Sequence, residues 1–282
     1  TLGRYCGATA LTFNMHVSAT LWTGTLTDDL DLTRAQREEH ERHRSLHYER
    51  IVGEGALYAH PFSENSAAST GKAPFGTTAT RTDGGWLLNG KKIFTSLSGA
   101  ADYYGLFCSE NRPGADAPTL RDAMFVAVPR DAPGLSVAGD WDPLGMRATV
   151  SRNLLLRDVF VPDDAQLLPR GVFYQAANRW PHMFLTLAPT YLGIAIAAYE
   201  FSVRYLRGEV GDIDPPVRRR MYPTKQLAVA QMNILLEQSR ALFLRAFSEA
   251  RVDPPTDVRL RALAAQYTIM ENANEICRLA IR

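Results

Sequence analysis

The stretch GGWLLNGKKIFTSLSGAADYY, from Gly84 to Tyr104, decides the fold of this chain. A turn at Asp83-Gly84-Gly85 leads into a short alternating strand, Trp86–Leu88. Asn89-Gly90 predicts a two-residue hairpin turn, because both central positions of a type I′ turn require a positive φ. The return strand, Lys91–Ser96, delivers an aromatic ring and two hydroxyls to a turn of small residues. Such an end can leave polar groups free for a flat polar ligand, and a plain β-hairpin is the alternative.

Short strands are predicted on both sides of this hairpin, between Phe75 and Pro162. Gly, Pro and Asp residues separate them, a pattern typical of an antiparallel barrel or sandwich. The other predicted strands are Thr77–Arg81, Tyr103–Cys108, Ala123–Val128, Leu135–Ala138 and Leu154–Val161.

Helices are predicted before and after this β region. Thr33 and Thr256 are the expected N-caps of two of them. The predicted helices are Thr9–Leu21, Asp31–Arg50, Gly171–Leu206, Tyr222–Ala250 and Val258–Arg282. The last three are long and have short connections, which predicts an antiparallel bundle. The expected fold class is α+β, with a partial N-terminal helical domain (1–54), a central β-domain (55–165) and a C-terminal helical bundle (166–282).

Three histidines, His40, His43 and His47, have helical spacing and could face the same way. A metal site would need a closed set of ligands, and neighbouring arginines such as Arg44 would repel a cation. The HExxH pattern is also absent. The prediction is therefore a solvated helix face and no metal site.

Composition and charge exclude several classes of protein. The chain has 282 residues and a formal net charge of +1, so nothing favours nucleic acid or an anionic membrane. Three separated cysteines, Cys6, Cys108 and Cys277, fit reduced thiols in a cytoplasmic protein. No signal peptide is visible. The apolar run Phe184–Ala198 contains Pro189 and predicts a buried helix, not a membrane span.

Two segments carry a resemblance to a known family. NGKKIFTSLSGAADYY (Asn89–Tyr104) resembles the segment of acyl-CoA dehydrogenases that lies in the central β-domain and touches the flavin of FAD. WDPLGMRATVS (Trp141–Ser151), which leads to Val159–Pro162, resembles a second motif of that family. Two long motifs at a fitting separation are more specific than a lone glycine pattern. Compared with this family, the chain is expected to be incomplete at both ends.

The resemblance implies which residues contact FAD. Phe94 would be the aromatic wall, where the family usually has Trp. Thr95 or Ser96 would supply a hydroxyl near N5/O4, and the Phe62 backbone and Ser63 would serve the N1/O2 edge. Donors at these atoms stabilise the reduced anionic flavin.

The same resemblance places two residues near the substrate. The stretch Gly53–Ser69 is similar to a family strand and loop that run along the flavin, although the proline and glycine expected after Glu64 are absent. Ser69 from this stretch and Met183 at the start of the bundle are the predicted substrate contacts.

In the family, the adenine and pyrophosphate end of FAD usually rests on a neighbouring subunit, through an arginine and a glutamine. Arg219 and Gln226, within RRRMYPTKQ (Arg218–Gln226), are the predicted contacts. The family's Phe-Gly is missing here, and Tyr222-Pro223 stands near its place. A solvated basic turn is the alternative.

The catalytic base is not identified by the motifs. The family uses a glutamate, either in its C-terminal segment or at the start of the helix after the β-domain. From Ala165 to Tyr199 the chain has no Asp or Glu, and the matching position falls close to Met183. The base is therefore expected beyond Arg282, and His182 is the one titratable alternative nearby.

The implied reaction is α,β-dehydrogenation of an acyl-CoA thioester in lipid metabolism, with hydride passing from the β-carbon to flavin N5. An electron-transfer flavoprotein is the implied acceptor, and the family implies a homodimer or homotetramer. Two alternatives remain open. One is a flavin-dependent monooxygenase or oxidase on the same fold, and the other is a non-catalytic partner subunit of a heteromeric enzyme.

Overall fold

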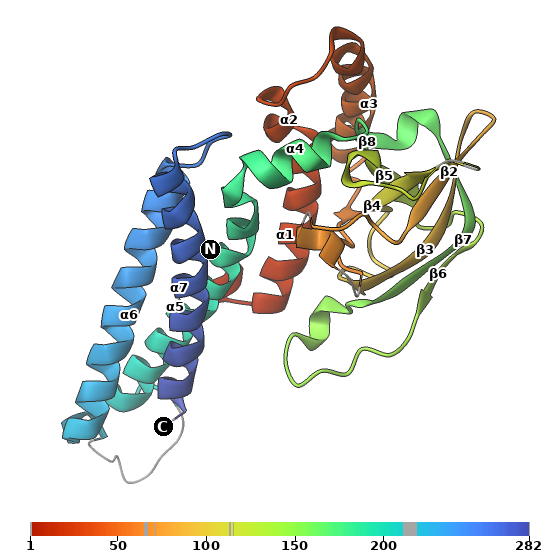
Figure 1. The fold of residues 1–282 in the computed structure, drawn as a ribbon. Helices are drawn as coiled ribbons and strands as arrows, with labels where there is room; N and C mark the ends of the chain where they lie inside the picture. Colours follow the sequence, from red (N-terminus) through yellow and green to blue (C-terminus); the bar gives the residue numbers. More distant parts are fainter. Residues whose placement is uncertain are drawn as a thin grey trace. The chain divides into compact units, whose positions relative to one another are not determined.

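The computed structural model describes residues 2–64, 67–70, 72–112, 114, 116–210 and 219–281. The chain divides into two compact units (Figure 1). The sheet unit is Thr12–Trp180, and the helical unit combines Thr1–Leu11 with Pro181–Arg282. The helical unit is therefore built from two segments that are far apart in the sequence.

One eight-stranded sheet forms the centre of the sheet unit. Its strands are β1 (Tyr58–Ala59), β2 (Thr78–Thr82), β3 (Gly85–Thr95), β4 (Tyr103–Asn111), β5 (Ala123–Pro129), β6 (Leu135–Ala138), β7 (Arg152–Pro162) and β8 (Gln166–Leu168). The order is β6-β7-β3-β2-β4-β5-β8, with β1 beside β4. Most pairings are antiparallel, as predicted, but β2–β4 and β1–β4 are parallel.

The sheet is buried on both faces at its centre. Neighbouring residues of a strand point to opposite faces, so successive residues of β4 contact two different sets of side chains. Along β4, Leu106 and Cys108 belong to an aliphatic core that includes Val126 and Leu154. Phe107 lies between them in the chain and contacts a set of aromatic rings instead. Those rings are Trp22, Phe62, Phe75, Phe125 and Phe173.

The predicted hairpin at Asn89-Gly90 is wrong. Gly85–Thr95 is one continuous strand, and the chain reverses at Asp83-Gly84 instead, where Thr82 pairs with Gly85. Gly90 has φ 154°, and the pairing of β3 with β7 shifts register between Leu88 and Gly90. A Cβ on Gly90 would lie 2.6 Å from Thr77 Cα, so glycine is required here for close backbone approach within a bulged strand.

Four α-helices contribute to the sheet unit. They are α1 (Gly7–Thr23), which begins in the helical unit, α2 (Thr25–Asp28), α3 (Arg34–Gly53) and α4 (Val172–Arg179). The predicted N-cap of α3 is confirmed, since the Thr33 hydroxyl accepts from Gln36 N–H at 3.2 Å in a capping box. The short helix α2 was not predicted.

The predicted solvated histidine face on α3 is wrong for two of its three members. His40 and His47 are buried. The His40 ring is 2.9 Å from the Thr27 hydroxyl and 3.0 Å from the Thr23 carbonyl, while His47 Nδ1 lies 2.9 Å from the Tyr58 hydroxyl. Tertiary packing therefore overrides the polar character of these residues, since each finds a hydrogen-bond partner. Among the described residues no group of His, Cys, Asp and Glu is placed to hold a metal ion.

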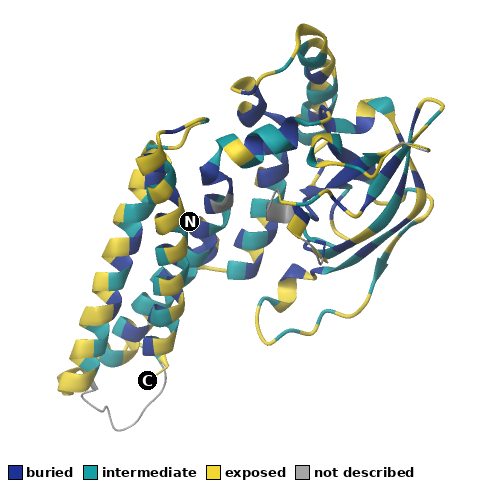
Figure 2. Ribbon diagram, viewed as in Figure 1, coloured by how far each residue is buried: buried dark blue, intermediate teal, exposed yellow. Residues whose placement is uncertain are grey.

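Three long helices form the rest of the helical unit: α5 (Ala188–Arg207), α6 (Pro223–Ser248) and α7 (Thr256–Ala280). They pack side by side around Leu192, Met232, Leu236, Ile269 and Ile276, with exposed residues on their outer sides (Figure 2). The bundle was predicted, and the α+β fold class is confirmed.

Two details of the predicted helices are wrong. The single helix Gly171–Leu206 is broken into α4, a 3-10 segment (Pro181–Leu187) and α5. Pro181 lacks an N–H donor and disfavours helical backbone at the preceding Trp180, which has φ −119° and ψ 84°. Thr256 is the first residue of α7, after a Pro255 N-cap that makes no side-chain bond.

One helical stretch, Pro181–Arg207, is long and apolar enough to cross a membrane by length and composition. Its second part, α5, packs against α6 and α7 through Leu192 and Ala195 in the core of the bundle.

Candidate functional site

The two motif segments meet in the sheet unit. Thr95 at the end of β3 pairs with Arg152 at the start of β7, and Leu97 N–H donates to Thr149 O at 3.1 Å. We call residues Phe94–Ser98 and Met146–Ser151 the β3–β7 junction. They are some 50 residues apart in the chain and adjacent in the fold because β3 and β7 are antiparallel neighbours.

The backbone of the junction is strained. Phe94, Leu97, Met146 and Val150 have φ of 54°, 68°, 58° and 45°, in the left-handed region that non-glycine residues rarely adopt. They are four of the six such residues in the described parts of the chain. Strained backbone of this kind clusters at ligand sites, where the surrounding structure holds it in place.

The Phe94 ring is free to contact a ligand. It is 57% exposed, although the neighbouring Thr95 is fully buried. On one side it meets Trp141 edge to face, with the ring centroids 6.2 Å apart. An exposed aromatic ring held by a second ring is a suitable wall for a flat heteroaromatic ligand.

Three buried hydroxyls belong to the same junction. Ser96 Oγ is 2.8 Å from Ser151 Oγ, which is 2.7 Å from Thr149 Oγ1. The Thr149 hydroxyl donates to Met146 O at 2.9 Å. The Thr95 hydroxyl is buried and has no hydrogen-bond partner among the described residues. An orphaned buried hydroxyl beside an exposed ring is consistent with a place for a polar cofactor.

Phe62 and Ser63 lie beside the junction. Ile93 N–H donates to Ser63 O at 2.9 Å, which joins this segment to β3 one residue before Phe94. The Phe62 ring points into the aromatic set and contacts Phe75 and Phe107. The structure therefore brings together the five residues predicted to contact the flavin ring system.

A buried ion pair that the sequence did not suggest fixes this segment. Glu64 Oε1 accepts from Lys92 Nζ at 2.6 Å and from Thr77 N–H at 3.0 Å, and Oε2 accepts from Gly76 N–H at 2.6 Å. Lys92 also lies over the Phe75 ring, 4.7 Å from its centroid.

Both members of this pair have shifted pKa values. Burial opposes the charge of Glu64, but Lys92 and the Thr77 and Gly76 donors outweigh it and hold its pKa below the ordinary value. Burial lowers the pKa of Lys92, against the attraction of Glu64. The carboxylate is saturated with donors, so the pair is a rigid tie between the 62–64 segment, β2 and β3.

Ser69 belongs to a short 3-10 helix, Ala67–Thr70, and its side chain lies outside the described part of the structure. Asn65, Ser66 and the side chain of Arg219 also lie outside the described part of the structure. For these predicted positions the structure gives no contact.

The remaining predicted residues lie in the helical unit. His182 and Met183 are buried in the segment Pro181–Leu187, and burial lowers the pKa of His182. Neither ring nitrogen of His182 has a hydrogen-bond partner among the described residues. Gln226, in the first turn of α6, is exposed and donates to Arg220 O at 2.9 Å.

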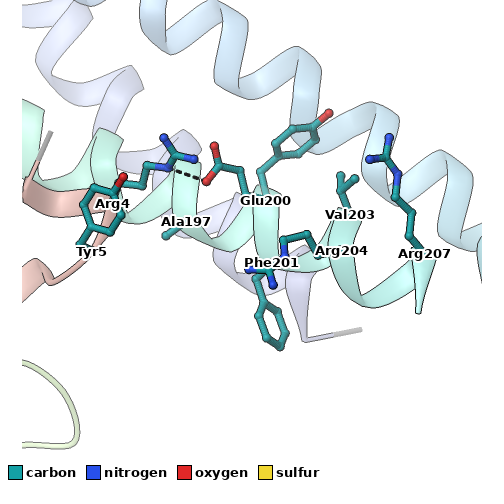
Figure 3. A pocket seen from close by; sticks show the side chains of 9 residues that line it. Arg4, Tyr5, Ala197, Glu200, Phe201, Val203, Arg204 and Arg207 are labelled. Carbon is teal, nitrogen blue, oxygen red and sulfur yellow. Dashed lines mark hydrogen bonds and ion pairs between the residues drawn. The ribbon is translucent and has the colours of Figure 1, made fainter. Parts of the chain in front are cut away.

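Gln226 lines a cavity of about 450 Å³ in the helical unit together with two cationic side chains, Arg207 and Arg220. A second cavity, of about 430 Å³, lies between α5 and Arg4-Tyr5 and shares the lining residues Tyr199, Val203 and Arg207 with the first (Figure 3). There Arg4 Nε donates to Glu200 Oε2 at 2.6 Å, so part of its positive charge is already paired. The first cavity contains a predicted site residue, and the second does not.

The sequence motifs included Thr149, Ser151 and Trp141 but gave no role to them. Thr149 and Ser151 gave no usable local signal, because the segment is not extended: Thr149 ends a 3-10 turn and Val150 has φ 45°. Glu64 and Lys92 also gave no such signal, because a strand lysine is usually solvent-facing.

Comparisons with known proteins show which proteins this chain resembles. Residues 59–159 match the family model "Acyl-CoA dehydrogenase, middle domain". A benzylmalonyl-CoA dehydrogenase of Aromatoleum aromaticum is 30% identical over 213 residues, which are 73% of this chain and 52% of that protein. An L-evernosamine nitrososynthase of a Micromonospora species is 34% identical over 177 residues, 58% of this chain and 39% of that protein.

Solved structures share the fold. A glutaryl-coenzyme A dehydrogenase in complex with glutaryl-CoA superposes with a TM-score of 0.77 at 20% identity, over 99% of this chain and 66% of that one. The chain spans about half or less of the length of the curated relatives it matches. Residues 59–159 are thus an acyl-CoA dehydrogenase middle domain, and the chain is a relative of the acyl-CoA dehydrogenases that shares their fold.

Proposed function

We propose that this chain is part of a flavin-dependent oxidoreductase that binds FAD and dehydrogenates an acyl-CoA thioester between its α and β carbons. The observation that carries the proposal is the β3–β7 junction, where an exposed aromatic ring, buried hydroxyls and strained backbone meet. The match of residues 59–159 to the acyl-CoA dehydrogenase middle domain supports the flavin. The relative named benzylmalonyl-CoA dehydrogenase supports a CoA thioester as substrate.

The flavin supplies the hydride acceptor when it is bound. Phe94 would contact one face of its ring system, and the junction hydroxyls would lie at one edge. The Glu64–Lys92 tie would hold the Phe62–Ser63 segment in register with β3, so that the opposite edge of the ligand meets a fixed backbone. Such preorganisation lowers the cost of binding, because few side chains need to be ordered.

Arg207, Arg220 and Gln226 would hold phosphate groups of a cofactor whose ring system is bound by a neighbouring subunit. Guanidinium groups bind phosphate through paired N–H donors, and the cavity they line is large enough for a pyrophosphate. Arg219 remains a prediction beside them.

The base for the α-proton is not assigned. His182 stays a candidate, because its lowered pKa keeps the ring neutral at pH 7 and able to accept a proton. Met183 and Ser69 remain predicted substrate contacts, and an electron-transfer flavoprotein remains the proposed electron acceptor.

A homodimer or homotetramer is also proposed. Large apolar side chains on α6 and α7 are exposed in the single chain, among them Leu227 (70%), Phe247 (74%) and Tyr267 (70%). Several large exposed apolar side chains on two neighbouring helices support an interface. Sedimentation velocity on the purified protein tests it, and a monomer at micromolar concentration would contradict it.

A second candidate function is a flavin-dependent monooxygenase or oxidase. Two observations favour it: the 34% identity to a nitrososynthase, and the absence of Asp and Glu from the sequence between Ala165 and Tyr199. A base, a glutamate in the family, is needed for α-proton removal but not for reaction of a reduced flavin with oxygen. A partner subunit without flavin is the third possibility, and it predicts a colourless protein.

The visible spectrum of the purified protein, before and after anaerobic addition of mixed acyl-CoA thioesters, tests these alternatives. A flavin band that bleaches supports the dehydrogenase. A flavin band that persists with acyl-CoA and bleaches with a nicotinamide-driven reductase supports the oxygen-using enzyme.

A matched pair of variants tests the junction itself. Phe94→Ala is expected to weaken flavin binding by about threefold to tenfold, the range of one aromatic contact. Phe160→Ala removes another exposed ring, on β7 of the same sheet, and is expected to retain the flavin. Equal flavin loss in both variants would contradict the placement.

A further inference from the structure

The three hydroxyls of the β3–β7 junction form a linear series of hydrogen bonds, the hydroxyl chain, which ends on a backbone carbonyl. Ser96, Ser151 and Thr149 are 6%, 6% and 1% exposed, so water does not readily compete for their hydrogen bonds. The successive oxygen–oxygen distances are 2.8, 2.7 and 2.9 Å, the last to Met146 O. Each hydroxyl has one proton to donate, and the carbonyl can only accept.

These facts determine which hydroxyl donates and which accepts at each step, and we call this direction the proton order. Thr149 donates to Met146 O, so its oxygen must accept from Ser151. Ser151 has then used its proton, so it must accept from Ser96. The reverse order would leave two oxygens 2.9 Å apart with lone pairs facing each other in a buried site, which is costly.

The Met146 carbonyl, at the end of the hydroxyl chain, is held in place by further hydrogen bonds. Met146 O also accepts from Thr149 N–H and from Trp141 Nε1–H, both at 3.2 Å. The carbonyl therefore cannot swing away to free the Thr149 proton without breaking two further bonds. Cooperative hydrogen bonding along the chain adds to this preference.

We infer that Ser96 presents a lone pair, not a proton, to a ligand at the junction, and so discriminates in favour of the reduced flavin. The inference rests on the proposed function. Oxidised isoalloxazine has an unprotonated N5, which can only accept, whereas the two-electron reduced ring carries an N5–H donor. A hydroxyl that has given its proton to Ser151 can pair with the second and not with the first. This differs from the donor role that the family resemblance implied for Thr95 or Ser96.

Thr149→Val tests the inference, because valine keeps the shape and removes the terminal hydroxyl. Ser151 then has Ser96 as its remaining acceptor, which frees the Ser96 proton for a ligand. The affinity for oxidised relative to reduced flavin is expected to rise about fivefold, the effect of one hydrogen bond of about 1 kcal/mol. For a two-electron couple this is a potential about 20 mV more negative, measured by anaerobic spectroelectrochemical titration of the bound flavin.

A double-variant cycle separates this effect from general disturbance. In a Ser96→Ala background, Thr149→Val is expected to leave the potential unchanged, because position 96 no longer presents a hydroxyl to the ligand. Thr80→Val, on β2 of the same sheet and outside the hydroxyl chain, is the matched control and should also leave it unchanged. A shift that persists in the Ser96→Ala background, or no shift in Thr149→Val with flavin bound, overturns the inference.

Failure of the proposed function has a different signature, namely wild-type protein without a flavin band. The proton order can then still be read directly from neutron diffraction on deuterium-exchanged crystals. Deuterium on Ser96 that points to Ser151 supports the inference, and deuterium on Ser151 that points to Ser96 overturns it.

Discussion

The Glu64–Lys92 pair shows at the scale of single residues how the sheet unit fixes its site. The two side chains are 28 residues apart in the sequence, and Lys92 is wholly buried. Taking two charges out of water is expensive, and their attraction repays it only with good geometry and additional hydrogen bonds. The Thr77 and Gly76 donors supply those bonds.

Lys92→Met is expected to destabilise the sheet unit by about 3–5 kcal/mol, because it leaves a buried carboxylate without its counter-charge. The double variant Glu64→Gln/Lys92→Met should be less destabilised than Lys92→Met alone, since no buried charge remains. Urea unfolding followed by tryptophan fluorescence measures both. A double variant less stable than Lys92→Met would contradict this and show that the Glu64 carboxylate, held by the Thr77 and Gly76 donors, is stabilising even without Lys92.

At the scale of residues, the motifs named one group of site residues, whose contact with flavin stays a prediction. Phe94, Thr95, Ser96, Phe62 and Ser63 were all named from the sequence, and the fold brings them together. The hydroxyl chain and the Glu64–Lys92 pair were not found, because each depends on which distant strands become neighbours. The residue pattern within a strand indicates which face of the sheet a side chain lies on. It does not indicate which distant residue a buried lysine will contact.

At the scale of elements, residue type predicted where helices and strands begin and end better than it predicted how the chain connects them. The Thr33 capping box and the bounds of β6 follow directly from residue type and alternation. The Asn89-Gly90 signal was misleading, because a glycine that permits a hairpin turn also permits a bulge and a close approach to Thr77. Long-range packing decides between these uses.

The cap of α3 gives a test at this scale. Thr33→Ala removes the side-chain acceptor for Gln36 N–H and is expected to cost about 1 kcal/mol of unfolding free energy. Ser45→Ala lies in the middle of the same helix on an exposed position and should instead stabilise slightly, by about 0.5 kcal/mol, because alanine has the higher helix propensity. Equal effects of the two substitutions in urea unfolding would contradict the capping role.

At the scale of the whole molecule, the sequence predicted the fold class and bundle but not the two-segment helical unit. All four tryptophans, Trp22, Trp86, Trp141 and Trp180, lie in the sheet unit. Intrinsic fluorescence therefore reports the unfolding of that unit alone. No periodicity in the sequence indicates that Leu2–Leu11 packs with residues beyond Pro181, because such a pairing has no local pattern.

The pH dependence of the sheet unit follows from its buried histidines. Burial, with Arg50 and His43 nearby, lowers the pKa of His47 to about 4 from its ordinary 6.5. The unfolded chain then binds a proton that the folded one does not, so stability is complete above about pH 6.5 and falls toward pH 4. The loss from His47 is about 3 kcal/mol, and fluorescence-detected urea midpoints from pH 7.5 to 4.5 should show it. His47→Gln should flatten this slope, and an unchanged slope would assign the loss to other groups, with buried His60 the next candidate.

The two-segment helical unit has a consequence for biosynthesis. Gly3 and Gly193 approach so closely that a Cβ on Gly193 would lie 2.6 Å from Gly3 C, and Arg4 pairs with Glu200 across 196 positions. At about 5–20 residues per second, the ribosome needs roughly 10–40 s between these partners. During that interval the whole sheet unit leaves the exit tunnel and can fold, while Leu2–Leu11 has no surface to dock on. The sheet unit therefore folds first, and Leu2–Leu11 stays undocked until α5 emerges.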